Sequence, residues 1–292
     1  MVFVFFVILV VFAFVTMNAF NDTSSITKKS NSAHIGVITI EGVINSSKDY
    51  VELLQSAEED KQIQAIILRI DSPGGAVGPT QEIYEEILRI DKIKPIYASF
   101  GGMAASGGYY LGAATRKIWA NPGTLTGSIG VIMEFMDLSK LYEFAKVSPQ
   151  TVKAGRYKDA GNPARALTAE EQDMMNKLIA GVHTQFKNDV LRRRKDKIKG
   201  DINELAQGQI YSGESAMAVG LVDAMGSLWT AGRAIHTEMK MKDDFALKFI
   251  EKKKKMGMFD LLGSIDEGIS KLNFSALGSA VQMNSSPRLM FK

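Results

Sequence analysis

The chain has 292 residues, of which 46% are hydrophobic and 23% are charged, and its net charge is +3. This length allows one large domain or two small ones, with enough residues to bury a core. The small charge and the lack of a basic stripe interleaved with aromatic residues argue against nucleic-acid binding. No cysteine is present, which excludes a disulfide framework and a thiolate zinc site.

Residues 2–15 form an uninterrupted apolar run at the N-terminus. Extended to residue 20, the run approaches the roughly 20 residues that a helix needs to span a bilayer. We therefore predict a transmembrane signal anchor over residues 1–20, and a cleaved signal peptide or a buried core helix are the alternatives. Lys28 and Lys29 follow the run and no basic residue precedes it, which favours a cytoplasmic C-terminal side by the positive-inside rule.

A polar linker is predicted over residues 21–33. Beyond it, apolar runs rich in β-branched residues alternate with amphipathic segments, which indicates an α/β fold with parallel strand pairing. We predict a single domain over residues 34–237. The predicted strands are 35–40, 64–70, 95–100, 117–120 and 128–133, and the predicted helices are 51–60, 81–90, 106–114 and 167–194.

The remaining residues, 238–292, form a C-terminal tail of different character. A lysine run at 252–255 precedes apolar residues that recur with roughly helical spacing. Two interpretations stay open for this tail. It could be an amphipathic segment at a membrane surface or against a neighbouring subunit, or it could be loosely packed.

Three glycine-rich turns follow predicted strands, at residues 71–75, 101–108 and 124–130. Open α/β sheets place their chemistry in loops at the carboxyl ends of strands. Glycine there lets backbone N–H groups approach a ligand closely, as an oxyanion hole requires. Neither of the phosphate-binding patterns GxxxxGK[ST] and GxGxxG occurs at these turns, so a nucleotide site is not expected. Simple chain reversal is the alternative role of each glycine.

Ser106 lies in the second of these turns, in the sequence GGMAASGGYY at 101–110. A serine between small residues at a tight strand-to-helix turn is typical of a nucleophile, and its hydroxyl needs a base to take its proton. Histidine is the usual base, but none of the three histidines has a distinctive sequence context: His34, His183 and His236. Lysine is the natural alternative, and a lysine must be removed from water to act as a base near neutral pH.

Four motifs in order resemble the signal peptide peptidase SppA family, whose members are serine proteases with a fold similar to ClpP and crotonase. They are DSPGG at 71–75, GMAASGGYY at 102–110, TGSIGV at 126–131 and AGRYKD at 154–159. The resemblance covers roughly residues 34–240. It implies a ClpP/crotonase-like ββα superhelix and no cofactor or metal.

The resemblance also implies a role for five residues. The second motif supplies the nucleophile, Ser106, and the fourth supplies a lysine general base, Lys158. Ser128 of the third motif would orient the lysine amine. The amides of Gly75 and Gly107 would form the oxyanion hole.

The implied function is that of a membrane-anchored serine endopeptidase. Its substrates would be cleaved signal peptides or other short apolar peptides, hydrolysed through an acyl-enzyme. In the short form of the family the active site lies between adjacent protomers of a ring-shaped homo-oligomer, so Ser106 and Lys158 of one chain need not meet. The resemblance implies a single-pass membrane protein with an extracytoplasmic peptidase domain, and Lys28 and Lys29 conflict with that orientation.

Two other function classes compete with the peptidase. A crotonase-like acyl-CoA enzyme usually needs glutamates at the strand ends, where this chain has SPGG at 72–75 and AAS at 104–106. The N-terminal apolar run also fits such a metabolic enzyme poorly. A catalytically inactive membrane-anchored scaffold is the other class, and the intact serine, lysine and diglycine argue against it.

Overall fold

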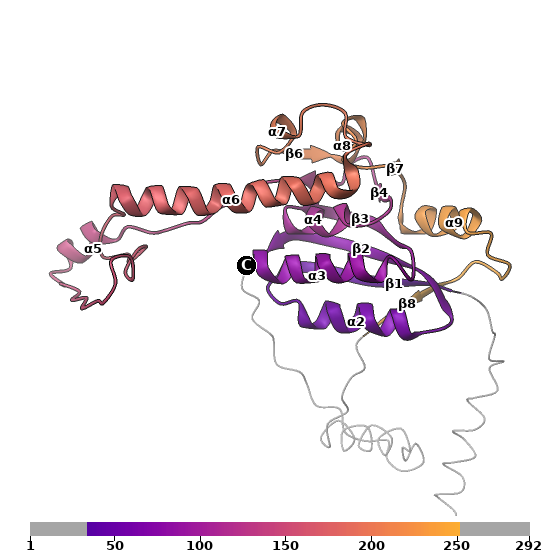
Figure 1. Ribbon diagram of the computed structural model, residues 1–292, viewed down its shortest axis with the longest axis horizontal. Coiled ribbons are helices and arrows are strands. Elements are labelled where there is room, and N and C mark those ends of the chain that lie inside the picture. Colours follow the sequence, from indigo (N-terminus) through magenta and orange to yellow (C-terminus); the bar gives the residue numbers. More distant parts are fainter. Residues whose placement is uncertain (1–33, 252–292) are drawn as a thin grey trace, which may run out of the picture. The chain divides into compact units, whose positions relative to one another are not determined.

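An eight-stranded sheet organises residues 34–251, the part of the chain that the computed structural model describes (Figure 1). The predicted anchor, the linker and the tail beyond residue 251 lie outside the described residues. None of the described helices combines the length and the apolar character that crossing a membrane would require.

Strand order in the sheet is β6-β5-β3-β2-β1-β8, with β4 paired to β3 and β7 paired to β4. All pairs are parallel except β5 with β6. This confirms the predicted α/β fold with parallel pairing. The strands are β1 His34–Ile44, β2 Ile63–Gly75, β3 Ile96–Ala105, β4 Ile118–Ala120, β5 Leu125–Gly127, β6 Ile210–Ser212, β7 Ala224–Met225 and β8 Leu247–Phe249.

Helices cover both faces of the central strands, which explains why those strands are almost continuously apolar. Along β2, Ile66 and Leu68 join the larger core cluster with the helices α2, α3, α4 and α6, whereas Ile67 joins a second cluster with α9. Alternate side chains of one strand thus reach opposite layers. The helices are α2 Lys48–Glu59, α3 Val77–Ile90, α4 Gly107–Ala113, α5 Ser139–Phe144, α6 Ala169–Arg194, α7 Ile202–Leu205, α8 Gly213–Ala218 and α9 Leu228–Glu238.

The prediction of a strand over 128–133 is wrong. The strand β5 ends at Gly127, and Gly127 and Ser128 have consecutive positive φ angles of 79° and 50°. Two left-handed residues in a row turn the chain out of the sheet. Beyond this turn Ile132 and Met133 are exposed, so their apolar character does not mark a buried strand. At the other end, β8 lies beyond residue 237, where we expected the domain to end, and it pairs with β1.

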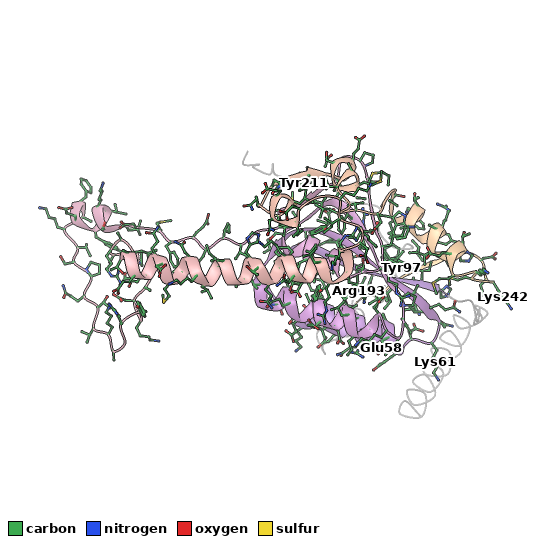
Figure 2. The ribbon with its side chains drawn as sticks, turned by 45° about the horizontal axis from the view of Figure 1, so that its top comes forward. Glu58, Lys61, Tyr97, Arg193, Tyr211 and Lys242 are labelled. Carbon is green, nitrogen blue, oxygen red and sulfur yellow. The ribbon has the colours of Figure 1, made fainter. Side chains whose placement is uncertain are left out.

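Residues 131–168, which we call the arm, leave the sheet together with the first half of α6 (Figures 1 and 2). No residue of the arm is buried. Its apolar side chains are instead exposed, and Ile132 and Phe144 retain 83% and 85% of their accessible surface. The arm therefore has no hydrophobic core of its own.

The opposite end of α6 is anchored in the main body of the fold by Arg194, whose side chain is fully buried. Its guanidinium donates to the two carboxylate oxygens of Asp223 at 3.0 and 3.1 Å and to the carbonyl of Gly220 at 2.9 Å. Burial alone would raise the pKa of Asp223, but the hydrogen bonds and charge of Arg194 outweigh it and lower that pKa. The ion pair thus fixes the direction in which α6 leaves the sheet.

We expect Arg194→Met to lower the free energy of unfolding by about 3 kcal/mol, because it removes the two-pronged contact of a largely buried carboxylate and leaves Asp223 with the partly exposed Lys197 ammonium as its cationic partner. The matched control is Arg192→Met, two positions earlier, whose ion pair with Glu85 is exposed on both sides and contributes at most about 1 kcal/mol. Urea unfolding of both variants measures the difference. Equal losses in the two variants would contradict an anchoring role for Arg194.

Candidate active site

A cavity of about 550 Å³ opens at the carboxyl ends of the central strands. It is lined by four of the five residues that the sequence singled out: Gly75, Ser106, Gly107 and Ser128. The turns at the ends of β2, β3 and β5 bring them together, because parallel strands end at the same edge of a sheet.

Ser106 occupies the junction between β3 and α4 in a strained backbone conformation, with φ 50° and ψ −119°. Such angles are rare for a residue with a side chain and cost of order 1–3 kcal/mol, so surrounding contacts must hold them. The Ser106 amide donates to the carbonyl of Gly127 at 2.9 Å, and its own carbonyl accepts from the Tyr110 amide at 2.9 Å. A half-buried serine held in this way faces the cavity, as a nucleophile must.

The end of β2 lies directly against the start of α4. A Cβ atom placed on Gly107 would lie 3.2 Å from the amide nitrogen of Gly75, and one placed on Gly74 would lie 2.7 Å from the amide nitrogen of Gly107. Gly107 opens α4, so its N–H has no acceptor within the helix. Two backbone amides therefore approach each other beside Ser106, in the arrangement that an oxyanion hole needs.

Ser128 follows β5 on the neighbouring strand, where Gly127 is in register with Ala105 of β3. Its amide donates to the carbonyl of Gln209 at 2.8 Å, which helps to hold the positive φ of the serine. This register places Ser128 one position beyond the strand partner of Ala105, close to the junction that carries Ser106.

The rest of the cavity wall combines apolar residues with the polar residues Thr80, Gln81, His183 and Gln207. The apolar and aromatic lining residues are Pro73, Val77, Tyr110, Val131, Ile132, Val182 and Phe186. Helix α6 crosses the cavity and contributes Val182 and Phe186, which are one helical turn apart. The apolar part of this wall could contact an apolar group bound beside Ser106.

His183 also lines the cavity, and the sequence context gave no sign of this. Its Nε2 lies 2.7 Å from the carbonyl oxygen of Ala206, to which it donates. The ring is therefore oriented by a backbone acceptor. The spacing of Val182 and Phe186 on α6 could have marked this helix face as part of a site, but the same spacing equally fits a core helix.

Lys158 is the one predicted site residue that the structure does not bring to the cavity. It lies exposed in a turn of the arm, where its amide donates to the carbonyl of Gly155 at 3.3 Å. The turn is bonded to Glu171 in the first turn of α6, while the cavity is lined by His183. These two helix positions are about 18 Å apart along the axis, farther than a lysine side chain spans.

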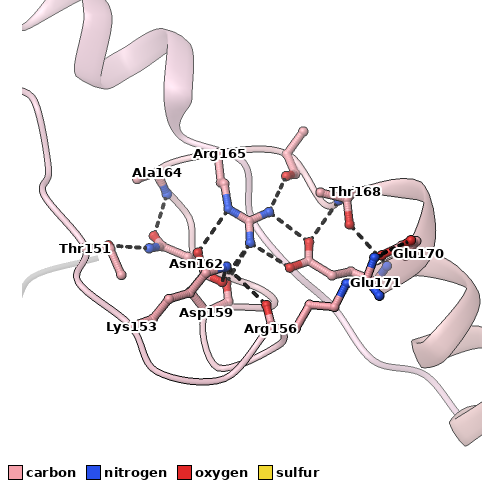
Figure 3. A network of polar contacts seen from close by, with 11 residues as sticks. Thr151, Lys153, Arg156, Asp159, Asn162, Ala164, Arg165, Thr168, Glu170 and Glu171 are labelled. Carbon is pink, nitrogen blue, oxygen red and sulfur yellow. Dashed lines mark hydrogen bonds and ion pairs between the residues drawn. The ribbon is translucent and has the colours of Figure 1, made fainter.

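Side chains around the Lys158 turn form a polar network (Figure 3). The Arg165 guanidinium donates to both carboxylate oxygens of Glu171, at 2.6 and 2.8 Å, and to a carboxylate oxygen of Asp159 at 3.3 Å. Lys153 forms an ion pair with the same Asp159. The Lys153 hydrogen bond, followed by the Arg165 contact, lowers the pKa of Asp159.

A strained serine beside paired glycine amides is the arrangement of a serine-type acyl-transfer enzyme. The sheet that carries it is of the Clp type, because the model of the Clp protease family matches residues 22–122. The model of peptidase family S49 matches residues 89–242, more than half of the chain. The chain belongs to this family, the SppA family of serine-type peptidases.

Individual relatives agree with this assignment. A protein from Synechocystis sp. described as a candidate protease is 39% identical over 202 residues, which are 68% of this chain and 72% of the relative. A candidate signal peptide peptidase SppA from Enterococcus faecium is 34% identical over 203 residues, and these are 69% of this chain but 59% of the relative.

A solved structure shares the fold. It is a mutant of the 1510-N membrane-bound stomatin-specific protease, which superposes with a TM-score of 0.51 at 15% sequence identity and covers 76% of this chain and 99% of the other. At this identity the likeness concerns the fold alone. Together with the Clp match it confirms the predicted ClpP-like architecture.

We expect Gly74→Ala to abolish labelling of the protein by a serine-directed phosphonate probe. Gly74 has φ 105°, and a Cβ there would clash with the Gly107 amide and the Ser106 side chain. The clash would displace the Gly107 amide from the position that an oxyanion hole needs. Gly123→Ala is the control, because a Cβ at Gly123 has no neighbour within 4 Å and no positive φ. If Gly74→Ala folds and is labelled at the wild-type rate, the close approach of β2 to α4 is not required for the reaction with the probe.

Proposed function

We propose that this chain is a serine endopeptidase of apolar peptides in which Ser106 is the nucleophile and Lys158 of a neighbouring copy is the general base. The observation that carries the proposal is the cavity that gathers Ser106, Ser128, Gly75 and Gly107 and has no lysine among the described residues 34–251 that line it. Membership of family S49 supports peptide hydrolysis as the reaction.

In the proposed mechanism the neutral Lys158 amine takes the proton from the Ser106 hydroxyl, whose oxygen attacks the scissile carbonyl. The Gly75 and Gly107 amides donate to the resulting oxyanion. The lysine ammonium returns its proton to the leaving amine, which breaks the peptide bond and leaves an acyl-enzyme. Water then gives a proton to the lysine and attacks the ester carbonyl. The acid product leaves as the ester bond breaks, and the Ser106 oxygen takes the proton back from the lysine. Ser128 orients the lysine amine from the cavity wall.

Assembly with further copies is part of the proposal for two reasons: the arm exposes apolar surface, and Lys158 does not reach the cavity of its own chain. The arm exposes apolar side chains such as Phe144 and Val152, and such a surface is typical of a contact with another protein surface. The same arm carries Lys158, which the cavity needs and its own chain does not deliver. A second copy packed on the arm would bury its apolar surface and place Lys158 beside the neighbour's Ser106. Repetition of this contact closes a ring.

The proposed substrates are cleaved signal peptides and other short apolar segments, and the apolar residues of the cavity wall support this class. Membrane attachment through residues 1–20 and an extracytoplasmic peptidase domain complete the proposal. They rest on the sequence outside the described residues, where Lys28 and Lys29 favour the opposite orientation.

Substitution tests the two catalytic assignments. We expect Ser106→Ala, Lys158→Ala and Lys158→Arg each to lower the rate of hydrolysis of an apolar peptide ester by a factor of about 10³ or more. The Lys158→Arg variant should be inactive because a guanidinium does not lose its proton at working pH. Lys140→Ala, which removes another exposed lysine of the arm, is the control. Full activity of both Lys158 variants, together with loss of activity in His183→Gln, would assign the base to a histidine of the same chain instead.

Mixing tests whether the site is shared between copies. Neither Ser106→Ala nor Lys158→Ala chains should react alone, but co-expressed chains should regain part of the activity, because a Lys158→Ala copy still offers Ser106 to an intact lysine of its neighbour. The measurement is the hydrolysis rate of purified mixed oligomers against the two separate variants. No recovery in oligomers shown by mass spectrometry to contain both chains would place the dyad within one chain.

A further inference from the structure

We propose that Arg165 and Glu171 are positioning residues for Lys158, which tie the lysine-bearing turn to the first turn of α6. This inference rests on the proposed role of Lys158 as the base and goes beyond it, because neither residue touches the cavity or the reacting atoms.

Arg165 holds the backbone on the carboxyl side of Lys158. Its guanidinium donates to the carbonyl of Asp159, the next residue, at 3.3 Å as well as to the Asp159 carboxylate. The same guanidinium makes its two-pronged contact with Glu171. A planar guanidinium that bonds a carboxylate through two nitrogens fixes both distance and orientation (Figure 3).

Lys153 holds the other side of the turn. Its ammonium donates to the carbonyl of Arg156 at 3.1 Å and pairs with the Asp159 carboxylate. The backbone at 156 and the side chain at 159 are therefore joined through one cation. Lys158 lies between these two fixed points, so the path of the backbone beneath it is determined by polar contacts.

Glu171 connects this turn to α6. Its carboxylate accepts from the Thr168 amide at 2.9 Å, and its own amide donates to the Thr168 hydroxyl at 3.2 Å, which is a complete capping box. Only 3% of Glu171 is exposed. The hydrogen bonds from Arg165 lower the pKa of Glu171 to about 2, so the carboxylate stays charged at any pH at which a lysine base operates.

Position matters for this lysine because its side chain is flexible. A lysine amine on four rotatable carbons reaches a productive geometry only if its backbone is held, and a misplacement of 1 Å can cost a factor of about 10² in rate. The arm has no buried residue to supply that hold. The Arg165–Glu171 contact supplies it, through a helix whose other end is fixed at Arg194.

Glu170 provides a matched comparison. It also lies in the first turn of α6 and also pairs with an arginine of the arm, Arg156. Both partners are exposed, however, with 56% and 67% of their side-chain surface accessible, and such pairs contribute little. Two adjacent carboxylates of one helix thus both contact the segment around Lys158 and differ mainly in burial.

The experiment compares Glu171→Gln with Glu170→Gln in the full chain, assayed on an apolar peptide ester. Glutamine retains the capping box but loses the charge that Arg165 binds. We expect Glu171→Gln to lower kcat about ten- to a hundredfold with KM within about twofold, because the arm beyond Ile132 does not line the cavity. Glu170→Gln should match the wild type. Arg165→Met should resemble Glu171→Gln, and Arg165→Lys, which keeps one charged donor, should recover part of kcat.

Controls separate this inference from the proposed function. Sedimentation and thermal unfolding establish that each variant assembles and folds as the wild type does. Normal kcat in Glu171→Gln and Arg165→Met, with Lys158→Ala inactive, would refute positioning and leave the dyad standing, whereas an active Lys158→Ala would refute the dyad itself. Equal effects of the two glutamate variants, or loss of assembly in both Glu171→Gln and Arg165→Lys, would also overturn the inference, since the network would then serve general stability.

Discussion

The buried ion pair between Arg194 and Asp223 fixes one end of α6, and this helix determines where both halves of the proposed site lie. Near its middle, α6 contributes Val182 and His183 to the cavity that contains Ser106. At its other end, the contact between Arg165 and Glu171 joins it to the turn that carries Lys158. Because an α-helix is stiff and rises about 1.5 Å per residue, this one element keeps the Lys158 turn away from the cavity of its own chain. In the proposed mechanism the lysine therefore serves the cavity of a neighbouring copy.

The cavity itself depends on backbone conformations that the sheet must stabilise. Ser106 and Ser128 both have φ 50°, and Gly74 has φ 105°. Side-chain-bearing residues adopt such angles only where neighbouring structure over-determines them. Here β2 and β3 are long, buried and hydrogen-bonded on both sides, so the most rigid part of the fold ends at the turns that carry the strain. Rigid strands followed by strained turns keep the proposed nucleophile, Ser106, and the neighbouring amides in place.

The sequence predicted the central strands well, because buried β-branched runs are a local signal. Such runs mark β1, β2 and β3, but β2 and β3 continue through the glycine-rich segments at 71–75 and 101–105, which we expected to be turns. The prediction of a strand at 128–133 was wrong because Ile132 and Met133 are apolar but exposed. Composition alone does not distinguish an apolar residue buried in its own core from an apolar residue on the surface. His183 was missed because a histidine on an amphipathic helix has no local signature of the cavity that it faces.

The Arg165 network was equally invisible to sequence reasoning, since charged residues in an arm ordinarily predict a solvated surface. Its role follows from what the arm lacks. A segment without buried side chains loses conformational entropy on ordering and gains no hydrophobic burial to offset it. Charge-assisted hydrogen bonds can order it in the single chain, because Glu171 is shielded by its own helix cap and stays ionised. In the proposed assembly, a Lys158 turn ordered beforehand would reach a neighbouring cavity with less entropy still to be lost, so the polar contacts that replace a core in the arm would also favour formation of the shared site.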